Sequence, residues 1–257
     1  MGWVLALFCW CSGAWLTPSR HLTVAGATGS LAYLRRAAAD FEKTYPPNTV
    51  ALSGGGSIAG LVEVSLGRVD IGISDVAPQR QWTRGVDLSS LALGRIPLLI
   101  IAHPGVGVSS LSTATIRALY SGQVTSWAQV GGRPDPVVVM TRPLSSGARQ
   151  VLQAKLLGDR PMSPDAVVVL SNGAMLAAVQ ETPGAIGFVE SGIVPSRVAL
   201  MAVGVTQFHS QDGATWPYAV TPTAYWKKSS SVWVRLLAEF LATRPYRRAF
   251  GLYPRAS

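Results

Sequence analysis

Short apolar stretches of two different periods alternate along the chain from His21 onward. In residues 31–44, Leu31, Leu34 and Phe41 recur at helical spacing. Stretches such as "TVALS" and "VDIGIS" have the length and composition of strands. The continuous apolar run that begins at Ile96, "IPLLIIA", is typical of a strand that helices cover on both faces. Strands that alternate with helices in this way predict an α/β fold with mostly parallel sheets.

The composition indicates a folded chain with a sizeable core. Apolar residues make up 48% of the 257 residues and charged residues only 14%, which argues against a chain kept disordered by its charge. This length allows one large domain or two small ones. The formal net charge of +9 favours an anionic partner, or a surface held near an anionic cell envelope, without distinguishing them.

Residues 1–20 have features of an export segment, which we interpret as a signal peptide or an N-terminal membrane anchor. Val4 to Trp10 form an apolar run that is too short to span a bilayer, and small residues follow it at 12–14. The segment also holds the only two cysteines, Cys9 and Cys11, so its removal leaves no thiol. We therefore expect an extracytoplasmic protein, in the periplasm or at the cell surface.

Three strand-to-helix corners combine glycine with hydroxyl side chains, at residues 26–30, 53–60 and 142–149. Glycine lets the backbone approach a ligand closely, and the free amides of a first helical turn attract negative charge. The third corner adds Arg142 and Arg149 beside a positive helix end, where two cations are unfavourable unless an anion neutralises them. An ordinary helix N-cap is the alternative role for a residue such as Ser57.

Five segments, in collinear order from about Ala25 to Val189, resemble the PstS family, the phosphate-binding proteins of ABC-type phosphate importers. They are "AGAT", "GGSIAGL" with "VDIGISDVAP", "IRALYSGQVTSWAQVGG", "TRPLSSGAR" and "PGAIGFV". The resemblance implies a two-lobed periplasmic-binding-protein fold of type II, with phosphate held in a cleft between the lobes. It further implies a membrane permease as partner, no catalysis, and neither a cofactor nor a metal; we expect a monomer.

The resemblance also implies which residues bind the anion. Two positions depart from the family pattern: Ala148 replaces a threonine, and Gly29 replaces an aromatic or apolar residue. Neighbouring hydroxyls at Ser30 and Ser145 are candidates to compensate, and Arg149 is a further candidate contact. The residues that match the family's phosphate-binding positions are Thr28, Ser57, Ile58 (through its amide), Asp75, Arg142, Ser146 and Gly147.

Asp75 follows a strand in "ISDVAP" and places a carboxylate where an anion is expected. A carboxylate there is favourable if it accepts a hydrogen bond from a proton that the ligand itself carries. A fully ionised oxyanion such as sulfate would then be rejected. The alternative is a side chain that only stabilises its own turn.

The lobe boundaries follow from where the chain can cross. We expect residues 21–102 and about 201–257 to form the first lobe and residues 103–200 the second. The first crossing is expected near Ala102 to Pro104, and the return between about Glu190 and Thr221. Closure of such lobes around a ligand is a hinge motion.

Other functions remain open at this stage. A relative that binds or senses sulfate, molybdate or arsenate has the same pattern. A secreted phosphoryl-transfer or phosphatase-like enzyme lacks support, because the chain has no P-loop and no Gly-x-Ser-x-Gly elbow. His21, His103 and His209 have no metal-ligand spacing. Nucleic-acid binding is not expected, since the densest basic run, "RPYRRAFGLYPR", also suits a solvated tail.

Overall fold

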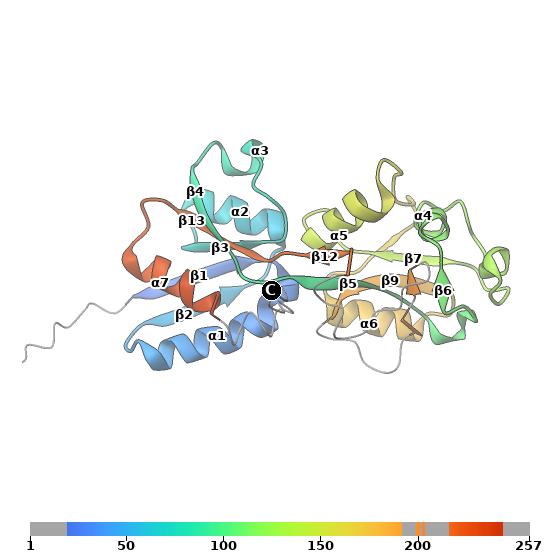
Figure 1. Ribbon diagram of the computed structural model, residues 1–257, viewed down its shortest axis with the longest axis horizontal. Coiled ribbons are helices and arrows are strands. Elements are labelled where there is room, and N and C mark those ends of the chain that lie inside the picture. The colour runs from blue at the N-terminus through green and yellow to red at the C-terminus, as the bar shows by residue number, and fades with distance from the viewer. Residues whose placement is uncertain (1–19, 192–198, 201, 204–215, 244–257) are drawn as a thin grey trace, which may run out of the picture.

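Two β-sheets, each flanked by helices, divide the chain into two lobes that lie side by side (Figure 1). The computed structural model describes residues 20–191, 199–200, 202–203 and 216–243. The first sheet defines the first lobe. Its strands in spatial order are β2 (Thr49–Ser53), β1 (His21–Gly26), β3 (Ile71–Ser74), β13 (Thr223–Lys227) and β4 (Leu88–Ala92).

The second sheet defines the second lobe, and a short strand pair, β6 (Ser110–Leu111) with β11 (Ala202–Val203), lies beside it. Strand β12 (Ala219–Val220) pairs with β5 next to the main path of the sheet. The strands of that path, in spatial order, are β10 (Ala199–Leu200), β5 (Ile96–Ala102), β9 (Ala185–Glu190), β7 (Val138–Thr141) and β8 (Val167–Val168).

The α/β prediction is confirmed, but the sheets are mixed rather than mostly parallel. Strand β1 runs parallel to β2 and β3, and β7 runs parallel to β8 and β9. Antiparallel pairs arise where β5 and β13 join these parallel cores. Both strands adjoin the segments that carry the chain between the lobes.

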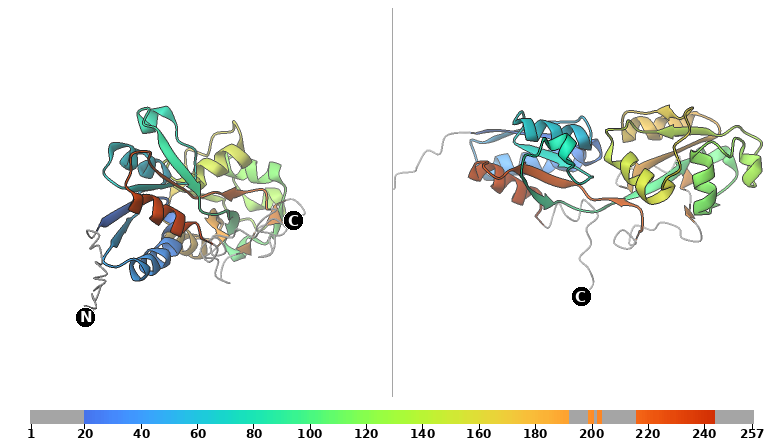
Figure 2. Two further views of the ribbon diagram at one scale, coloured as in Figure 1. Left: turned by 60° about the vertical axis from the view of Figure 1, so that its left-hand side comes forward. Right: turned by 90° about the horizontal axis from the view of Figure 1, so that it is seen from above.

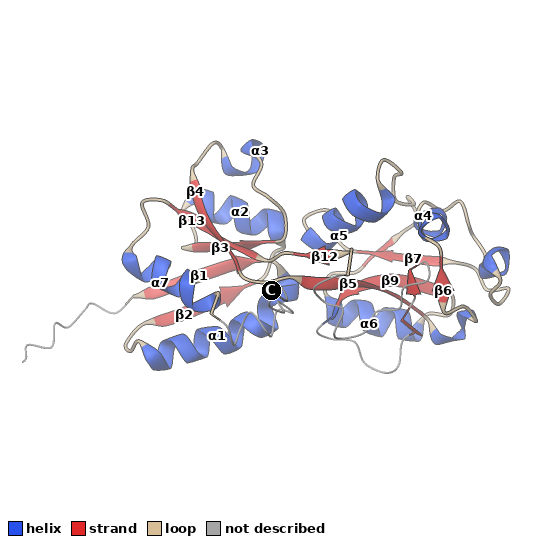
Figure 3. Cartoon of the chain, viewed as in Figure 1, coloured by secondary structure: helices blue, strands red, loops and turns tan. Residues whose placement is uncertain are grey.

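Helices cover both faces of each sheet, as the apolar strands require (Figure 3). In the first lobe, α2 (Ser57–Leu66) packs on one face, and α1 (Leu31–Thr44) and α7 (Val232–Leu241) pack on the other, with the rings of Phe41 and Phe240 5.4 Å apart. A one-turn helix, α3 (Arg80–Thr83), precedes β4. The second lobe carries α4 (Thr113–Tyr120), α5 (Gly147–Leu152), which continues as a π-helical turn to Leu157, and α6 (Asn172–Glu181).

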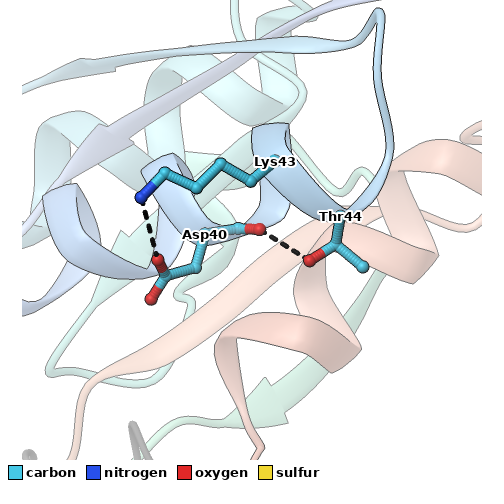
Figure 4. A network of polar contacts seen from close by, with 3 residues as sticks. All are labelled: Asp40, Lys43 and Thr44. Carbon is cyan, nitrogen blue, oxygen red and sulfur yellow. Dashed lines mark hydrogen bonds and ion pairs between the residues drawn. The ribbon is translucent and has the colours of Figure 1, made fainter.

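The C-terminal end of α1 carries an exposed polar network of Asp40, Lys43 and Thr44 (Figure 4). The Thr44 hydroxyl donates to the Asp40 carbonyl at 2.7 Å, and Lys43 Nζ lies 3.7 Å from Asp40 Oδ1. Water screens such exposed pairs, so this network contributes at most about 1 kcal/mol to stability.

The chain crosses between the lobes at two neighbouring places, between β4 and β5 and between β12 and β13 (Figure 2). The Leu93 amide donates to the Pro222 carbonyl at 2.8 Å, which joins the two crossing segments. The expected first crossing near Ala102 to Pro104 does not fit this pairing, because all of Ile96–Ala102 lies in the second sheet. A continuous apolar run marks a strand buried on both faces and does not reveal which sheet contains it.

Several expectations fall outside the described residues. These are the export segment at 1–19 and the basic C-terminal run. The return between β12 and β13 lies at the very end of the expected range, so β12, expected in the first lobe, instead pairs with β5 of the second sheet. No helix in the described part of the chain has the length and apolar character that a membrane span requires.

The second lobe contains a fully buried indole that makes a specific hydrogen bond. Trp127 is fully buried, and its Nε1 donates to the Gly184 carbonyl at 2.8 Å, beside the start of β9. We expect Trp127→Phe to lower the free energy of unfolding by about 1–3 kcal/mol, because it removes this hydrogen bond and leaves a gap in the core. Urea denaturation measures the change. Trp233→Phe, at a partly exposed position, serves as the control, and an equal loss in both variants would contradict this role for Trp127.

Candidate functional site

A cavity of about 210 Å³ lies where the three glycine-rich corners meet between the lobes. It is far larger than the roughly 10–15 Å³ that one water molecule needs. Thr28, Gly55 and Gly56 line it from the first lobe. The second lobe contributes Arg142, Pro143, Ser145, Ser146 and Leu170. The structure thus brings together the three corners that the sequence predicted to converge.

Arg142 is a buried cation at this cavity, with 3% of its surface exposed. Its Nη1 donates to Asn172 Oδ1 at 2.8 Å, and its Nη2 donates to Thr28 Oγ1 at 3.0 Å and to the Leu170 carbonyl at 3.1 Å. Burial lowers the pKa of the guanidinium, while the carboxylates of Glu190 and Asp75 oppose that change. Its hydrogen-bond partners are neutral groups from both lobes. They hold the planar guanidinium in place without forming an ion pair with it.

The first corner forms a 3-10 turn, Thr28–Ser30, that leads directly into α1. Helix α1 has no acidic residue in its first turn, and no side chain caps its first amides. Such a helix start favours a negative group. Ser30 is almost fully buried, and its Oγ has no hydrogen-bond partner.

Ser57 and Asp75 form a pair beside the cavity. Ser57 Oγ donates to Asp75 Oδ2 at 3.0 Å and accepts the Asp75 amide at 3.1 Å. The N-cap of α2 is Gly56, so the capping role considered for Ser57 is wrong. The turn after β3 is stabilised by Ser74, whose Oγ bonds both the amide and the carbonyl of Val76. Asp75 is therefore not needed for that turn, and its other oxygen, Oδ1, is buried without a partner.

The pKa of Asp75 is raised to about 7. Burial is the main cause, and the nearby carboxylate of Glu190 adds to it; the hydrogen bond from Ser57 and the charge of Arg142 act in the opposite direction. This carboxyl group therefore changes its protonation state near neutral pH.

Contacts between the lobes already occupy some of the predicted donors. The Ile58 amide donates to the Ser145 carbonyl at 3.3 Å, so it is bonded to the protein rather than directed at the cavity. Gly147, the first residue of α5, lies so close to the first lobe that a Cβ on it would be 2.4 Å from Ser57 Oγ and 2.5 Å from Asp75 Oδ2. Only glycine permits this approach.

The remaining residues of the third corner support Arg142 and the helix that follows it. Ser146 caps α5 by accepting the Arg149 amide at 3.4 Å, and its hydroxyl can still donate. Arg149 Nη1 donates to the Arg142 carbonyl at 2.8 Å, so Arg149 positions the loop. Ala148 packs in the hydrophobic core with 1% of its surface exposed.

Sequence reasoning missed two residues of the site, Asn172 and Glu190. Asn172 begins α6 and orients Arg142, whereas Glu190 ends β9 and lies against Gly29. Neither belongs to a glycine-rich corner. The sequence offered one signal for them: each is a polar residue at the end of a mostly apolar helix or strand.

Buried polar atoms without a partner gather around this site. Among the described residues they include both donors and acceptors, which suits a ligand that offers both kinds of group. These atoms are Ser30 Oγ, Asp75 Oδ1, Arg142 Nε, Asn172 Nδ2 and Glu190 Oε2. In the described part of the chain, no cluster of three or more histidine, cysteine, aspartate or glutamate residues is suited to a metal ion.

Comparison with known proteins places this geometry in a family. The model of the PBP superfamily domain matches residues 13–247. The chain is a member of the PBP superfamily. Within it, the chain is 26% identical to the phosphate-binding protein PstS of Bacillus subtilis (strain 168) over 206 residues, which cover 79% of this chain and 68% of that protein.

Solved structures confirm the two-lobed type II fold of this PBP chain. A substrate-binding protein from Clostridium perfringens, solved with bound phosphate, superposes with a TM-score of 0.83 at 19% identity and covers 90% of this chain and 96% of its own. An ABC-type phosphate transport receptor from Vibrio cholerae gives a TM-score of 0.74 at 24% identity, over 89% of this chain and 96% of its own. The chain is thus a distant homologue of PstS proteins. These three relatives are named as a phosphate-binding protein, a substrate-binding protein and a transport receptor.

The raised pKa of Asp75 predicts how the stability of the ligand-free protein changes with pH. The folded pKa of about 7 lies above the ordinary value of 3.8, so between those values the folded chain binds one proton more than the unfolded chain. The free energy of unfolding therefore falls as pH rises from about 4 to about 7 and is level above that range. Asp75→Asn, which stays neutral, should remove this slope, on the order of 2–4 kcal/mol.

Urea denaturation at a series of pH values measures the slope. Asp87→Asn, at an exposed carboxylate paired with Lys228, is the matched control and should keep the slope of the parent. Parallel profiles for the parent and Asp75→Asn would show that Asp75 titrates normally.

Proposed function

We propose that this protein binds inorganic phosphate in the cavity between its lobes, outside the cytoplasm, and delivers it to the membrane permease of an ABC-type importer. The names of its relatives and the bound phosphate of the Clostridium perfringens structure support the ligand. The export segment inferred from residues 1–20 supports the location. The residues that would contact phosphate are those of the three corners, together with Asp75.

The observation that carries the proposal is the buried guanidinium of Arg142. Among the residues that the structure describes, Arg142 makes no ion pair, and its partners are neutral oxygens. A buried cation is unfavourable unless a negative charge accompanies it. The carboxylates of Glu190 and Asp75 act on Arg142 without forming an ion pair with it. A tetrahedral oxyanion in the cavity would contact the guanidinium directly and would accept hydrogen bonds from Arg142, Thr28 and Ser146.

The carboxylate of Asp75 favours phosphate, which carries a proton, over an oxyanion that carries none. Its Oδ1 is buried without a partner, and its other oxygen lies against Gly147, next to the cavity-lining Ser146. The hydroxyl group of a phosphate would donate a hydrogen bond to this oxygen, whereas sulfate would bring a second unprotonated oxygen against it. Discrimination built on one such buried hydrogen bond reaches several powers of ten.

The two departures from the family pattern change the surroundings of the anion and leave Arg142 in place. At position 148 the alanine packs into the core, so no hydroxyl points from there to the ligand. The absence of a side chain at Gly29 makes room for Glu190. These changes bear on affinity and on which form of the anion is bound.

Substituting Arg142 tests the binding site. Isothermal titration calorimetry of the purified protein should show phosphate binding that Arg142→Ala weakens at least about 100-fold, since a charge-assisted contact to a buried anion is lost. Arg235→Ala removes an exposed arginine on α7 and should bind as the parent does. If phosphate gives no heat while molybdate, arsenate or sulfate does, the ligand is a different oxyanion.

Neutralising Asp75 tests the selectivity. The parent should reject sulfate, and Asp75→Asn should bind it, because an amide group can donate to an unprotonated oxygen where the carboxylate repels it. Competition between sulfate and phosphate measures the ratio of the two affinities. Equal exclusion of sulfate by the parent and by Asp75→Asn would remove Asp75 from the selectivity mechanism.

A further inference from the structure

Glu190 is a second buried carboxylate, and it lies against Gly29, the residue that follows the cavity-lining Thr28. It is the last residue of β9 in the second lobe, and only 4% of its surface is exposed. Its Oε1 lies against the first-lobe turn, so close that a Cβ on Gly29 would be 2.3 Å away. Its Oε2 is buried and has no hydrogen-bond partner.

The charge of Glu190 reaches the groups that would surround the anion. It raises the pKa of Asp75 after β3, opposes the lowering of the pKa of Arg142 after β7, and adds to the raised pKa of Tyr33 on α1. Arg149 on α5 is the other charged group near the loop, and it bonds the backbone of Arg142 from a partly exposed position. Within the described residues, the field on the ligand therefore comes mainly from one buried guanidinium and two carboxylates.

These charges are unfavourable for a doubly charged anion. When both carboxylates are ionised, they already exceed the single charge of Arg142. A dianion would leave the buried groups with a large negative excess, and uncompensated buried charge is costly. A singly charged anion adds less, and its second hydroxyl group offers one more donor to a site with unpaired carboxylate oxygens.

We propose that Glu190 makes the site selective for the singly charged, doubly protonated form of phosphate, H2PO4−. The inference rests on the proposed function, because it specifies the protonation state of the ligand proposed there. Glu190 acts through its charge, as a specificity-determining residue. This position of Glu190 requires glycine at position 29, since any side chain there would displace the carboxylate.

The test is calorimetry with inorganic phosphate at about pH 6 and about pH 8, which lie on either side of the ionisation that converts the monoanion into the dianion. For the parent, the dissociation constant for total phosphate should rise about tenfold or more between these values, because only the protonated form binds well. Glu190→Gln should reduce this rise to about threefold or less, mainly by tighter binding at the higher pH. Glu181→Gln, an exposed change of the same charge at the end of α6, should keep the profile of the parent.

A second measurement needs no variant and holds even if Glu190→Gln fails to fold. Titrations of the parent at about pH 8 in two buffers of different ionisation enthalpy count the protons taken up on binding, and the proposal predicts about one per phosphate. Equal or tighter binding at the higher pH, no proton uptake, or the same profile in the parent and Glu190→Gln would overturn the role of Glu190 while phosphate binding stands. No phosphate binding at either pH would overturn both proposals.

Discussion

The whole site depends on holding the guanidinium of Arg142 away from water with neutral groups as its hydrogen-bond partners. Asn172 and the Leu170 carbonyl accept hydrogen bonds from it within the second lobe. Thr28 of the first lobe accepts a hydrogen bond from its Nη2. A guanidinium keeps its proton at ordinary pH, so negative charge nearby favours its burial. The carboxylates of Glu190 and Asp75 supply such charge without an ion pair to Arg142. The same side chain joins the two lobes and, in the function proposed above, contacts the ligand.

Close approach of the backbones makes this arrangement possible. The absence of a side chain at Gly147 lets α5 meet Ser57 and Asp75, and the same feature at Gly29 lets Glu190 reach the first lobe. The short links between β4 and β5 and between β12 and β13 run next to each other, bonded from Leu93 to Pro222. A narrow pair of crossings of this kind suits the hinge motion expected of a protein that closes on its ligand.

The sequence was sufficient to predict the α/β architecture and the corners that line the cavity, because periodicity and glycine-rich turns are local features. The pairing of Ser57 with Asp75 was not predictable from the same pattern, since a serine at a helix start is equally typical of an N-cap. Glu190 and Asn172 were missed because their roles arise only when β9 and α6 meet the first lobe. Placing β5 in the wrong lobe has a similar cause, as burial on both faces is common to strands of either sheet.

A crystal structure of the protein with phosphate tests the central claim most directly. The account predicts one tetrahedral anion between the lobes, with one oxygen within hydrogen-bond distance of Arg142 and of Thr28, and another within reach of Asp75 Oδ1. An anion bound elsewhere on the surface, with Arg142 still bonded only to protein atoms, would contradict it.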